Sequence, residues 1–377
     1  MRLSYSTTII FLLLESRSIM DVNGEELITV AKWGSIDGRS VEKYTLKNKA
    51  GQEVDIITYG ATITSFRTPD KLGNIADVVL GFDNIEGYLS WDKLYFGSTI
   101  GRVANRIRNA EFTLNGEKYH LAKNVGEFIL HGGCKGWSMK IWNATVESNR
   151  LVLSLLSEDG DQGFPGAANA SVIFQLTTDG ELCMEIKVSV TKATPINLTN
   201  HAYFNLAGHN GNATELYKHR FMLNADRWTI TDTDNIPTGE IRSVVDTVMD
   251  LRNSTTLGDV IDKVPAGGYD SNFCVTASDT ANEKNLVARV LHPPSGRYLE
   301  VFSNQPGVQF YTSNCLPERN KVGIQGKNGS TYFKHAAFCL ETQNYPDAVN
   351  HENFPNSILE PGQIYHHIVI YKFGVVA

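Results

Sequence analysis

Cysteine is scarce in this sequence and follows no recognisable pattern. The chain has five cysteines, and none of them belongs to a Cys-x-x-Cys pair. An odd count without such pairs favours free thiols in a reducing compartment over a disulfide framework. We therefore expect a cytoplasmic protein. Cys183 and Cys339 lie in apolar runs, and we expect them to pack as small core residues.

Long apolar runs are also absent. The N-terminal run Ile9–Leu14 is too short to cross a bilayer, and no other segment resembles a membrane span. This run can be interpreted as a weak signal peptide or as part of an extension that precedes a second start at Met20. The unpaired cysteines favour the extension. We expect residues 1–23 to form a disordered or weakly signal-like extension and residues 24–377 to form a single soluble domain.

Positive charge is in deficit. The chain carries 34 Lys and Arg against 41 Asp and Glu, a net charge of −7, and no run of five or more like charges occurs. A nucleic-acid partner normally requires a basic patch on the protein. The sequence therefore predicts neither a nucleic-acid partner nor a solvating charged tail.

Several catalytic and cofactor motifs are incomplete or missing. Gly326–Asn328 lacks the upstream glycine and the Ser or Thr of a phosphate-binding loop. His351–Glu352 lacks the second histidine of a zinc-protease helix, and no Gly-x-Ser-x-Gly elbow occurs. The adjacent His366 and His367 lie in an expected strand, where neighbouring side chains point to opposite faces. We therefore expect no metal, no nucleotide cofactor and no serine nucleophile.

What the sequence has in abundance is the two-residue alternation of β-strands. Between Glu181 and Val190 the apolar residues occupy every second position, which is typical of a half-buried strand. A second strand is expected over Ser171–Thr177, and the Asp179–Gly180 step between the two suits a tight hairpin turn. The segment Glu111–Leu121 repeats this pattern around Asn115–Gly116.

Helical patterns are few. Only Asn84–Trp91 and Asn253–Val260 are expected to form short helices. Further strands are expected at Val54–Tyr59, Ala61–Arg67, Arg297–Phe302, Gly307–Thr312 and Gln363–Phe373. Many strands, turn residues between them and no linker predict one large all-β domain, an antiparallel sandwich or barrel.

Four segments combine polar side chains with glycine and aromatic residues. They are Phe96–Ile107, Leu130–Trp137, Asn197–Asn210 and Phe338–Asn350. Two of them place a titratable group in an apolar stretch, and these groups are His201, in NLTNHAYFNLAGHN, and Glu341, in FCLETQNYPDAVN. Asp270, in GGYDSNF, and Gln309, in QPGVQFYTSN, stand out in the same way. This composition is expected of a site that binds a hydroxyl-rich molecule and moves protons on it.

Six segments then resemble the signature segments of the aldose 1-epimerase, or galactose mutarotase, family in that family's order. They are GRVANRI, LHGG, NLTNHAYFNL, GYDSNF, QPGVQFYT and CLETQNYPDAVN, and the resemblance extends from about Gly34 to the C-terminus. It implies a large antiparallel β-sandwich that interconverts the α and β anomers of free hexoses such as galactose and glucose. It also implies that no metal or organic cofactor is needed and that the protein is a monomer.

Mutarotation requires one acid and one base. The anomeric hydroxyl loses a proton and the ring oxygen gains one, and unperturbed pKa values near about 4 and 6.5 suit a carboxylate and an imidazole to this work. By resemblance, Glu341 is the general base on the C1 hydroxyl and His201 the general acid on the ring oxygen. The resemblance also assigns sugar binding to Asn105, Arg106, His131, Asp270 and Gln309. We further expect Arg106 to keep a nearby carboxylate ionised.

Two other functions stay open at this point. An epimerase of a hexose 6-phosphate requires further Arg or Lys around the sugar's O6, and only Arg106 is well placed in the sequence. A non-catalytic sugar-binding module does not need the His201 and Glu341 couple. Among the neighbouring residues, we expect core packing rather than sugar stacking for Tyr203, Phe204 and Trp137, and an exposed loop position for His209.

Overall fold

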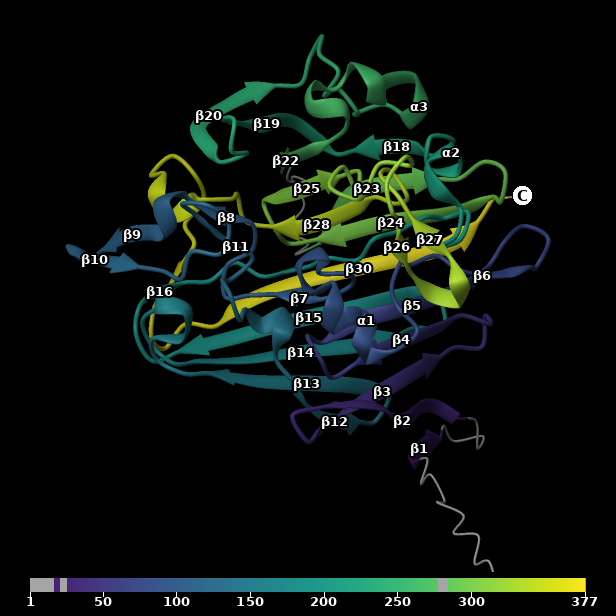
Figure 1. Cartoon of the computed structure of the whole chain (residues 1–377), viewed down its shortest axis with the longest axis horizontal. Helices are drawn as coiled ribbons and strands as arrows, with labels where there is room; N and C mark the ends of the chain where they lie inside the picture. The colour runs from purple at the N-terminus through teal and green to yellow at the C-terminus, as the bar shows by residue number, and fades with distance from the viewer. Residues whose placement is uncertain (1–16, 21–25, 277–283, 377) are drawn as a thin grey trace, which may run out of the picture.

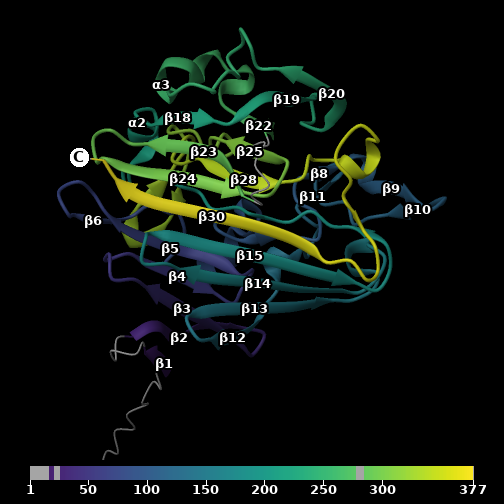
Figure 2. The ribbon, with the colours of Figure 1, turned by 180° about the vertical axis from the view of Figure 1, so that it is seen from behind.

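The computed structural model describes residues 17–20, 26–276 and 284–376. Strands make up 47% of the structure and helices 11%, which confirms the all-β prediction. All pairs of named strands in the described ranges are antiparallel, and Figures 1 and 2 show the longest of them crossing the molecule side by side. No helix within these ranges is long and apolar enough to cross a membrane.

The largest sheet has nine strands. Their order is β12 (Asn143–Glu147), β13 (Arg150–Ser157), β14 (Ala168–Leu176), β15 (Glu181–Val190), β30 (Tyr365–Val375), β24 (Arg297–Ser303), β23 (Asn285–Leu291), β18 (Arg220–Leu223) and β21 (Thr255–Thr256). The predicted strand over Glu181–Val190 coincides with β15, and its apolar positions are the buried ones. The turn at Asp179–Gly180 joins it to β14, as expected.

A six-stranded sheet covers part of one face of the nine-stranded sheet. It consists of β1 (Arg17–Met20), β2 (Glu26–Ile36), β3 (Arg39–Lys47), β4 (Glu53–Ile57), β5 (Thr62–Pro69) and β6 (Ile75–Asp77), in that order. β5 packs on β30, where the rings of Phe66 and Phe373 are 4.0 Å apart, and β3 packs on β14. The core between the two sheets confirms the predicted sandwich. Each fully buried aliphatic or aromatic side chain there contributes about 1.5–3 kcal/mol.

The first strand lies inside the stretch for which we expect an extension. Ile19 of β1 pairs with Ile28 of β2, so the six-stranded sheet begins before residue 24. Residues 1–16 lie outside the described residues, and the division of the chain into an extension and one domain stays a prediction.

A five-stranded sheet lies beside these two, toward the top of Figure 1. Its order is β20 (Pro237–Ser243), β19 (Ala225–Thr231), β22 (Asp270–Val275), β25 (Gly307–Tyr311) and β28 (Cys339–Gln343). Short two-stranded ribbons complete the strand structure: β7 (Thr99–Ile100) with β17 (Thr199–Asn200), β8 (Arg106–Ile107) with β11 (Ile129–Leu130), β9 (Glu111–Leu114) with β10 (Glu117–His120), β16 (Thr194–Pro195) with β29 (Ile358–Leu359), and β26 (Ile324–Gln325) with β27 (Thr331–Tyr332).

The helices are short. They are α1 (Ile85–Ser90), α2 (Asn212–Leu216) and α3 (Leu257–Val260), with single 3-10 turns η1 (Asp92–Leu94), η2 (Arg108–Ala110), η3 (Trp137–Met139), η4 (Asp161–Gly163), η5 (Ile261–Lys263), η6 (Pro265–Gly267), η7 (Lys327–Gly329) and η8 (Ala348–Asn350). Asn84 caps α1, because its side chain accepts the N–H of Gly87 at 3.0 Å. The second predicted helix is shorter than expected, because Thr255 and Thr256 pair with β18 at the edge of the large sheet.

Candidate active site

Glu341 stands at the centre of β28, a strand whose residues are all buried. In the register with β25 it lies directly opposite Gln309, so the two side chains share one face of the sheet. The side-chain amide of Gln309 donates to Asp270 Oδ1 at 2.7 Å, and Asp270 begins the next strand, β22. Three of the predicted site residues therefore come from three adjacent strands of one sheet.

His201 follows β17 and is fixed by its main chain. Its N–H donates to the Ser98 carbonyl, and its carbonyl accepts the N–H of Gly97, both at 2.9 Å. The imidazole stacks on Tyr203, with ring centres 5.0 Å apart and planes 10° apart. Tyr95 lies parallel on a longer contact of 6.1 Å. The rings of Tyr203 and Tyr95 together orient the imidazole and exclude water from it.

Asn105, Arg106 and His131 form a third group. Arg106 of β8 pairs with Leu130 of β11, which brings the next residue, His131, beside Asn105. The main-chain N–H of Asn105 donates to His131 Nδ1 at 3.2 Å, and the His131 N–H donates to the Asn105 carbonyl at 2.9 Å. The guanidinium of Arg106 donates to Asn105 Oδ1 at 3.2 Å and lies over the Phe128 ring.

All seven predicted site residues line one depression, which we call the central cleft. Its walls are Lys93, Leu94, Tyr95, Asn105, Arg106, Leu130, His131, His201, Tyr203, Asp270, Gln309, Tyr311, Cys315 and Glu341. The structure thus brings together segments that are up to 248 positions apart in the sequence, from Lys93 to Glu341. Sequence reasoning missed Lys93, Tyr95, Tyr311 and Cys315. Tyr311 had a usable signal, because it lies two positions after Gln309 in the same strand and so on the same face.

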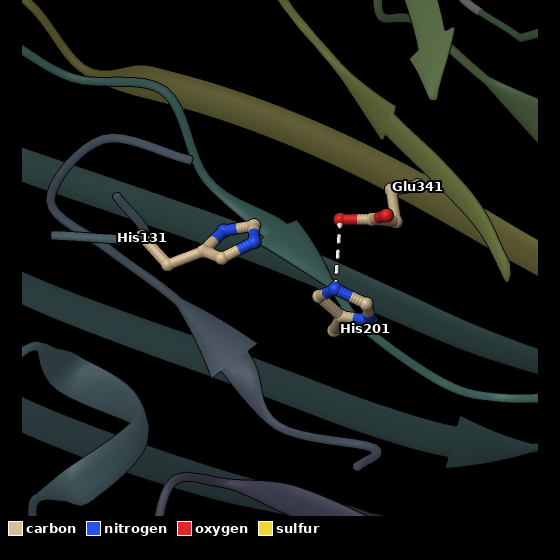
Figure 3. Close-up of side chains that lie close together, drawn as sticks. All are labelled: His131, His201 and Glu341. Atoms are coloured by element: carbon tan, nitrogen blue, oxygen red, sulfur yellow. Dashed lines mark ion pairs between the residues drawn. The ribbon is translucent and has the colours of Figure 1, made fainter. Parts of the chain in front are cut away.

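The side chains of His201 and Glu341 point toward each other in this cleft (Figure 3). His201 Nε2 and Glu341 Oε2 are 3.7 Å apart, and the side chains come from different elements. His201 is 5% exposed and Glu341 2% exposed. Glu341 Oε2, Gln309 Oε1, His201 Nδ1 and Arg106 Nε are buried and lack a hydrogen-bond partner among the described residues. Buried polar atoms are normally satisfied, so this set points to a polar ligand in the cleft.

Burial inverts the usual order of the two pKa values. It raises the pKa of Glu341 well above its ordinary value of 4.5, and the negative charge of Asp270 adds to this effect. The guanidinium of Arg106 lowers the pKa of Glu341, which is the direction expected of a cation beside a carboxylate, but burial and Asp270 outweigh it. Burial lowers the pKa of His201 to about 4. The Glu341 carboxyl therefore holds a proton more tightly than the His201 imidazole does.

His131, His201 and Glu341 also form a group that resembles a metal site. Their ligand atoms lie within 4.8 Å of one another (Figure 3). However, Nδ1 of His131 accepts the N–H of Asn105, so the proton of the neutral ring belongs on Nε2. That nitrogen can donate a hydrogen bond but has no lone pair for a metal. The arrangement suits a polar organic ligand better than an ion, which supports the expectation of no metal.

Two buried polar residues join the segments of the cleft. Asn197 makes two hydrogen bonds with Asn344, of 3.1 and 2.8 Å, and so connects the His201 segment to the Glu341 segment. Asp347 connects the Glu341 segment to β8. Its N–H donates to the Arg106 carbonyl at 3.1 Å.

The expectations for neighbouring residues are partly wrong. His209 is buried rather than exposed, because its Nδ1 contacts the hydroxyl of Tyr332 at 3.1 Å. Trp137, Phe204 and Tyr203 are buried core residues, as expected, and Tyr203 in addition stacks on His201 and lines the cleft. The described structure has all five cysteines free, with Cys339 buried and Cys183 only partly so.

Both the sequence and the structure are similar to those of known proteins. A family model described as "Aldose 1-epimerase" matches residues 42–372. The galactose mutarotase of Bos taurus is 46% identical over 336 residues, 89% of this chain and 95% of that protein. The galactose mutarotase of Homo sapiens is 44% identical over 92% of this chain and 99% of that protein. A solved aldose epimerase homologue from C. elegans superposes with a TM-score of 0.80 at 30% identity, covering 88% of this chain and 98% of that one.

Proposed function

The chain belongs to the aldose 1-epimerase family, and from this premise we propose that Glu341 and His201 open and close the sugar ring. The activity is that of an isomerase that interconverts the anomers of hexoses. The observation that carries the residue assignment is the buried carboxyl–imidazole pair, 3.7 Å apart in a cleft with unpartnered polar atoms.

In the proposed reaction Glu341 removes the proton of the C1 hydroxyl while His201 gives a proton to the ring oxygen. The C1–O5 bond breaks, the open-chain aldehyde rotates about C1–C2, and the reverse transfers close the ring as the other anomer. The pair needs one proton in total, and the two pKa shifts favour Glu341 over His201 as its holder. For the assigned direction, that proton must first pass from Glu341 to His201. Each positioned proton transfer contributes roughly 10²–10⁴-fold to the rate.

The other cleft residues supply complementary hydrogen-bonding groups for vicinal hydroxyls. His131 presents Nε2–H as a donor, because its other nitrogen is occupied by the Asn105 main chain. Asp270 only accepts, and Gln309 keeps Oε1 as a free buried acceptor while its amide N–H holds Asp270. Arg106 adds guanidinium donors to the wall of the same cleft. We propose these residues, with Asn105, as the sugar-binding set.

One observation favours a second substrate class. Lys93 is exposed and lines the central cleft, so Arg106 is not the only cation there among the described residues. A hexose 6-phosphate would gain from two cations. Comparing the anomerisation rates of glucose and glucose 6-phosphate decides between the two substrates, and we expect the free sugar to react faster because the negative charge of Asp270 repels an anion.

Location and assembly are proposed on the sequence. Five free thiols support a cytoplasmic enzyme. The family resemblance supports a monomer that acts on a small hexose without a nucleic-acid, membrane or cofactor partner.

The direct test is the decay of optical rotation of freshly dissolved α-D-galactose and α-D-glucose. We expect the protein to accelerate it, and Glu341→Gln and His201→Asn each to lose at least about 10²-fold in kcat. The chain offers a matched control in His366 and Glu185, a partly exposed imidazole–carboxylate pair 2.8 Å apart outside the cleft. His366→Asn and Glu185→Gln should keep full activity. A rate equal to that of buffer alone would refute the activity, and an active Glu341→Gln or His201→Asn would refute the role of that residue.

A further inference from the structure

Cys315 is an exposed cysteine in the wall of the central cleft. It lies four residues after Tyr311, which ends β25. Its main-chain N–H donates to the Tyr311 hydroxyl at 2.8 Å, and burial and the neighbouring thiol both raise the pKa of that phenol. The Tyr311 ring in turn meets the His201 imidazole edge-on at 6.4 Å. One aromatic side chain, that of Tyr311, therefore contacts both the main chain of Cys315 and the imidazole of the proposed catalytic histidine.

The space beside this thiol is built for a ligand. Glu341 Oε2 and Gln309 Oε1 line the same cleft, are buried, and have no hydrogen-bond partner in the described part of the chain. A group that is attached to the Cys315 sulfur and extends into the cleft therefore occupies space that a ligand bound to Glu341 and Gln309 would need.

We propose that Cys315 is a modification site at which a small disulfide closes the central cleft. The Cys315 thiolate attacks one sulfur of the disulfide, whose S–S bond breaks as a new mixed disulfide forms. The second sulfur leaves as a thiolate and takes up a proton, so atoms and electrons balance. The product carries a bulky group on the wall of the cleft and excludes the sugar. A reducing thiol reverses the exchange and reopens the cleft.

Cys134 provides the control that this proposal needs. It is the other exposed cysteine among the described residues, and it does not line the central cleft. A small disulfide should react with both thiols, but only the product at Cys315 should affect the cleft.

The experiment treats the full chain with glutathione disulfide and locates the mixed disulfides by peptide mass mapping. Sugar binding is measured by calorimetry with D-galactose, and anomerisation by optical rotation, each relative to the same untreated variant. We expect modification at Cys315 to reduce both at least tenfold in the wild type and in Cys134→Ser, with recovery after dithiothreitol. Cys315→Ser should lose neither on treatment. Saturating galactose should slow the labelling of Cys315 but not of Cys134.

The outcomes separate this proposal from the proposed function, on which its sugar readouts rest. Full modification of Cys315 with unchanged sugar binding and anomerisation overturns the closure, as does labelling that galactose does not slow. If the untreated protein neither binds nor anomerises sugar, the proposed function fails, and closure is then decided by carbethoxylation of His201, which lines the same cleft, with diethyl pyrocarbonate. Slower reaction of His201 after Cys315 is modified supports closure, and an unchanged rate refutes it.

Discussion

Asp347 holds the segment that carries Arg106 at two points, one in β8 and one in the turn η2 that follows it. Its N–H donates to the Arg106 carbonyl and its Oδ1 accepts the N–H of Arg108, each at 3.1 Å. The same Oδ1 accepts the side-chain amide of Asn350 at 2.7 Å. Since Asp347 follows Glu341 by six positions, one short segment carries the proposed base and sets the position of a proposed sugar-binding residue.

Asp347→Ala should therefore weaken sugar binding more than it slows the chemical step. We expect KM for galactose to rise about tenfold, because a lost buried hydrogen bond of about 1–3 kcal/mol lets β8 move with Arg106. We expect kcat to fall less than KM rises, because Glu341 and His201 are untouched. Asp347→Asn keeps Oδ1 as an acceptor and should lie between Asp347→Ala and the wild type. A fall of about tenfold in kcat with an unchanged KM would contradict this positioning role.

The pH dependence of kcat/KM should reflect the inverted pKa values. The active pair holds one proton. On the acid side a second proton enters His201, whose pKa burial lowers from 6.5 to about 4. Activity should thus persist below pH 6.5 and fall only as the pH passes about 4. Polarimetric rates at constant ionic strength, with circular dichroism as a check on folding, measure this limb, and a midpoint near 6.5 would argue against the assignment.

Asp270→Asn should move the alkaline limb of the same profile. The pair loses its single proton from Glu341, whose pKa is raised by burial and by the charge of Asp270. Removing that charge lowers the pKa of Glu341, so kcat/KM should begin to fall at a lower pH than in the wild type. The absolute rate should fall as well, because Asp270 is a proposed sugar contact. The position of the limb, normalised to each variant's maximum, is the measurement, and an unmoved limb would count against the coupling of the two carboxyl groups.

The buried side chain of Lys327, outside the central cleft, should be important for the stability of the fold. Lys327 Nζ forms an ion pair with Asp77 and donates to the Thr64 carbonyl at 2.8 Å. Lys327→Ala leaves the largely buried Asp77 carboxylate without its cation, so we expect a loss of about 3–5 kcal/mol in the free energy of unfolding. Lys123→Ala breaks an exposed ion pair with Glu127 and should leave the stability almost unchanged, because solvent screens the two charges. Urea unfolding of both variants compares the two, and equal midpoints would contradict the distinction.

Local signals predicted the fold wherever the local pattern was strong. Alternation alone gave β15 its bounds, and Asn115–Gly116 marked the β9–β10 hairpin. The predicted helix at Asn253–Val260 was too long, because pairing of Thr255 with β18 depends on a strand more than 30 positions upstream. His209 was placed wrongly for the same kind of reason, since its burial is set by Tyr332, 123 positions away.

The sequence predicted which residues line the candidate site, but it did not predict their pKa values. All seven residues came from ordered motifs and line one cleft, although their catalytic and binding roles stay proposals. The inverted pKa values could not be predicted, because they depend on burial and on the distance between Asp270 and Glu341 in space. The hydrogen bond from the Arg108 N–H to Asp347 could not be predicted either, because it joins residues 239 positions apart in the sequence.

The donor that fixes the His131 ring belongs to the main chain of Asn105. A substitution replaces a side chain and leaves this N–H in place. Proline is the exception, because it lacks an N–H and requires a φ near −65°. Asn105 has a φ of +61°, which proline cannot adopt. No single substitution at position 105 can therefore delete the donor and keep the local backbone. The tautomer of His131 that carries its proton on Nε2 is therefore insensitive to substitutions at position 105. Converting His131, His201 and Glu341 into a metal centre would require a different path of the backbone at Asn105.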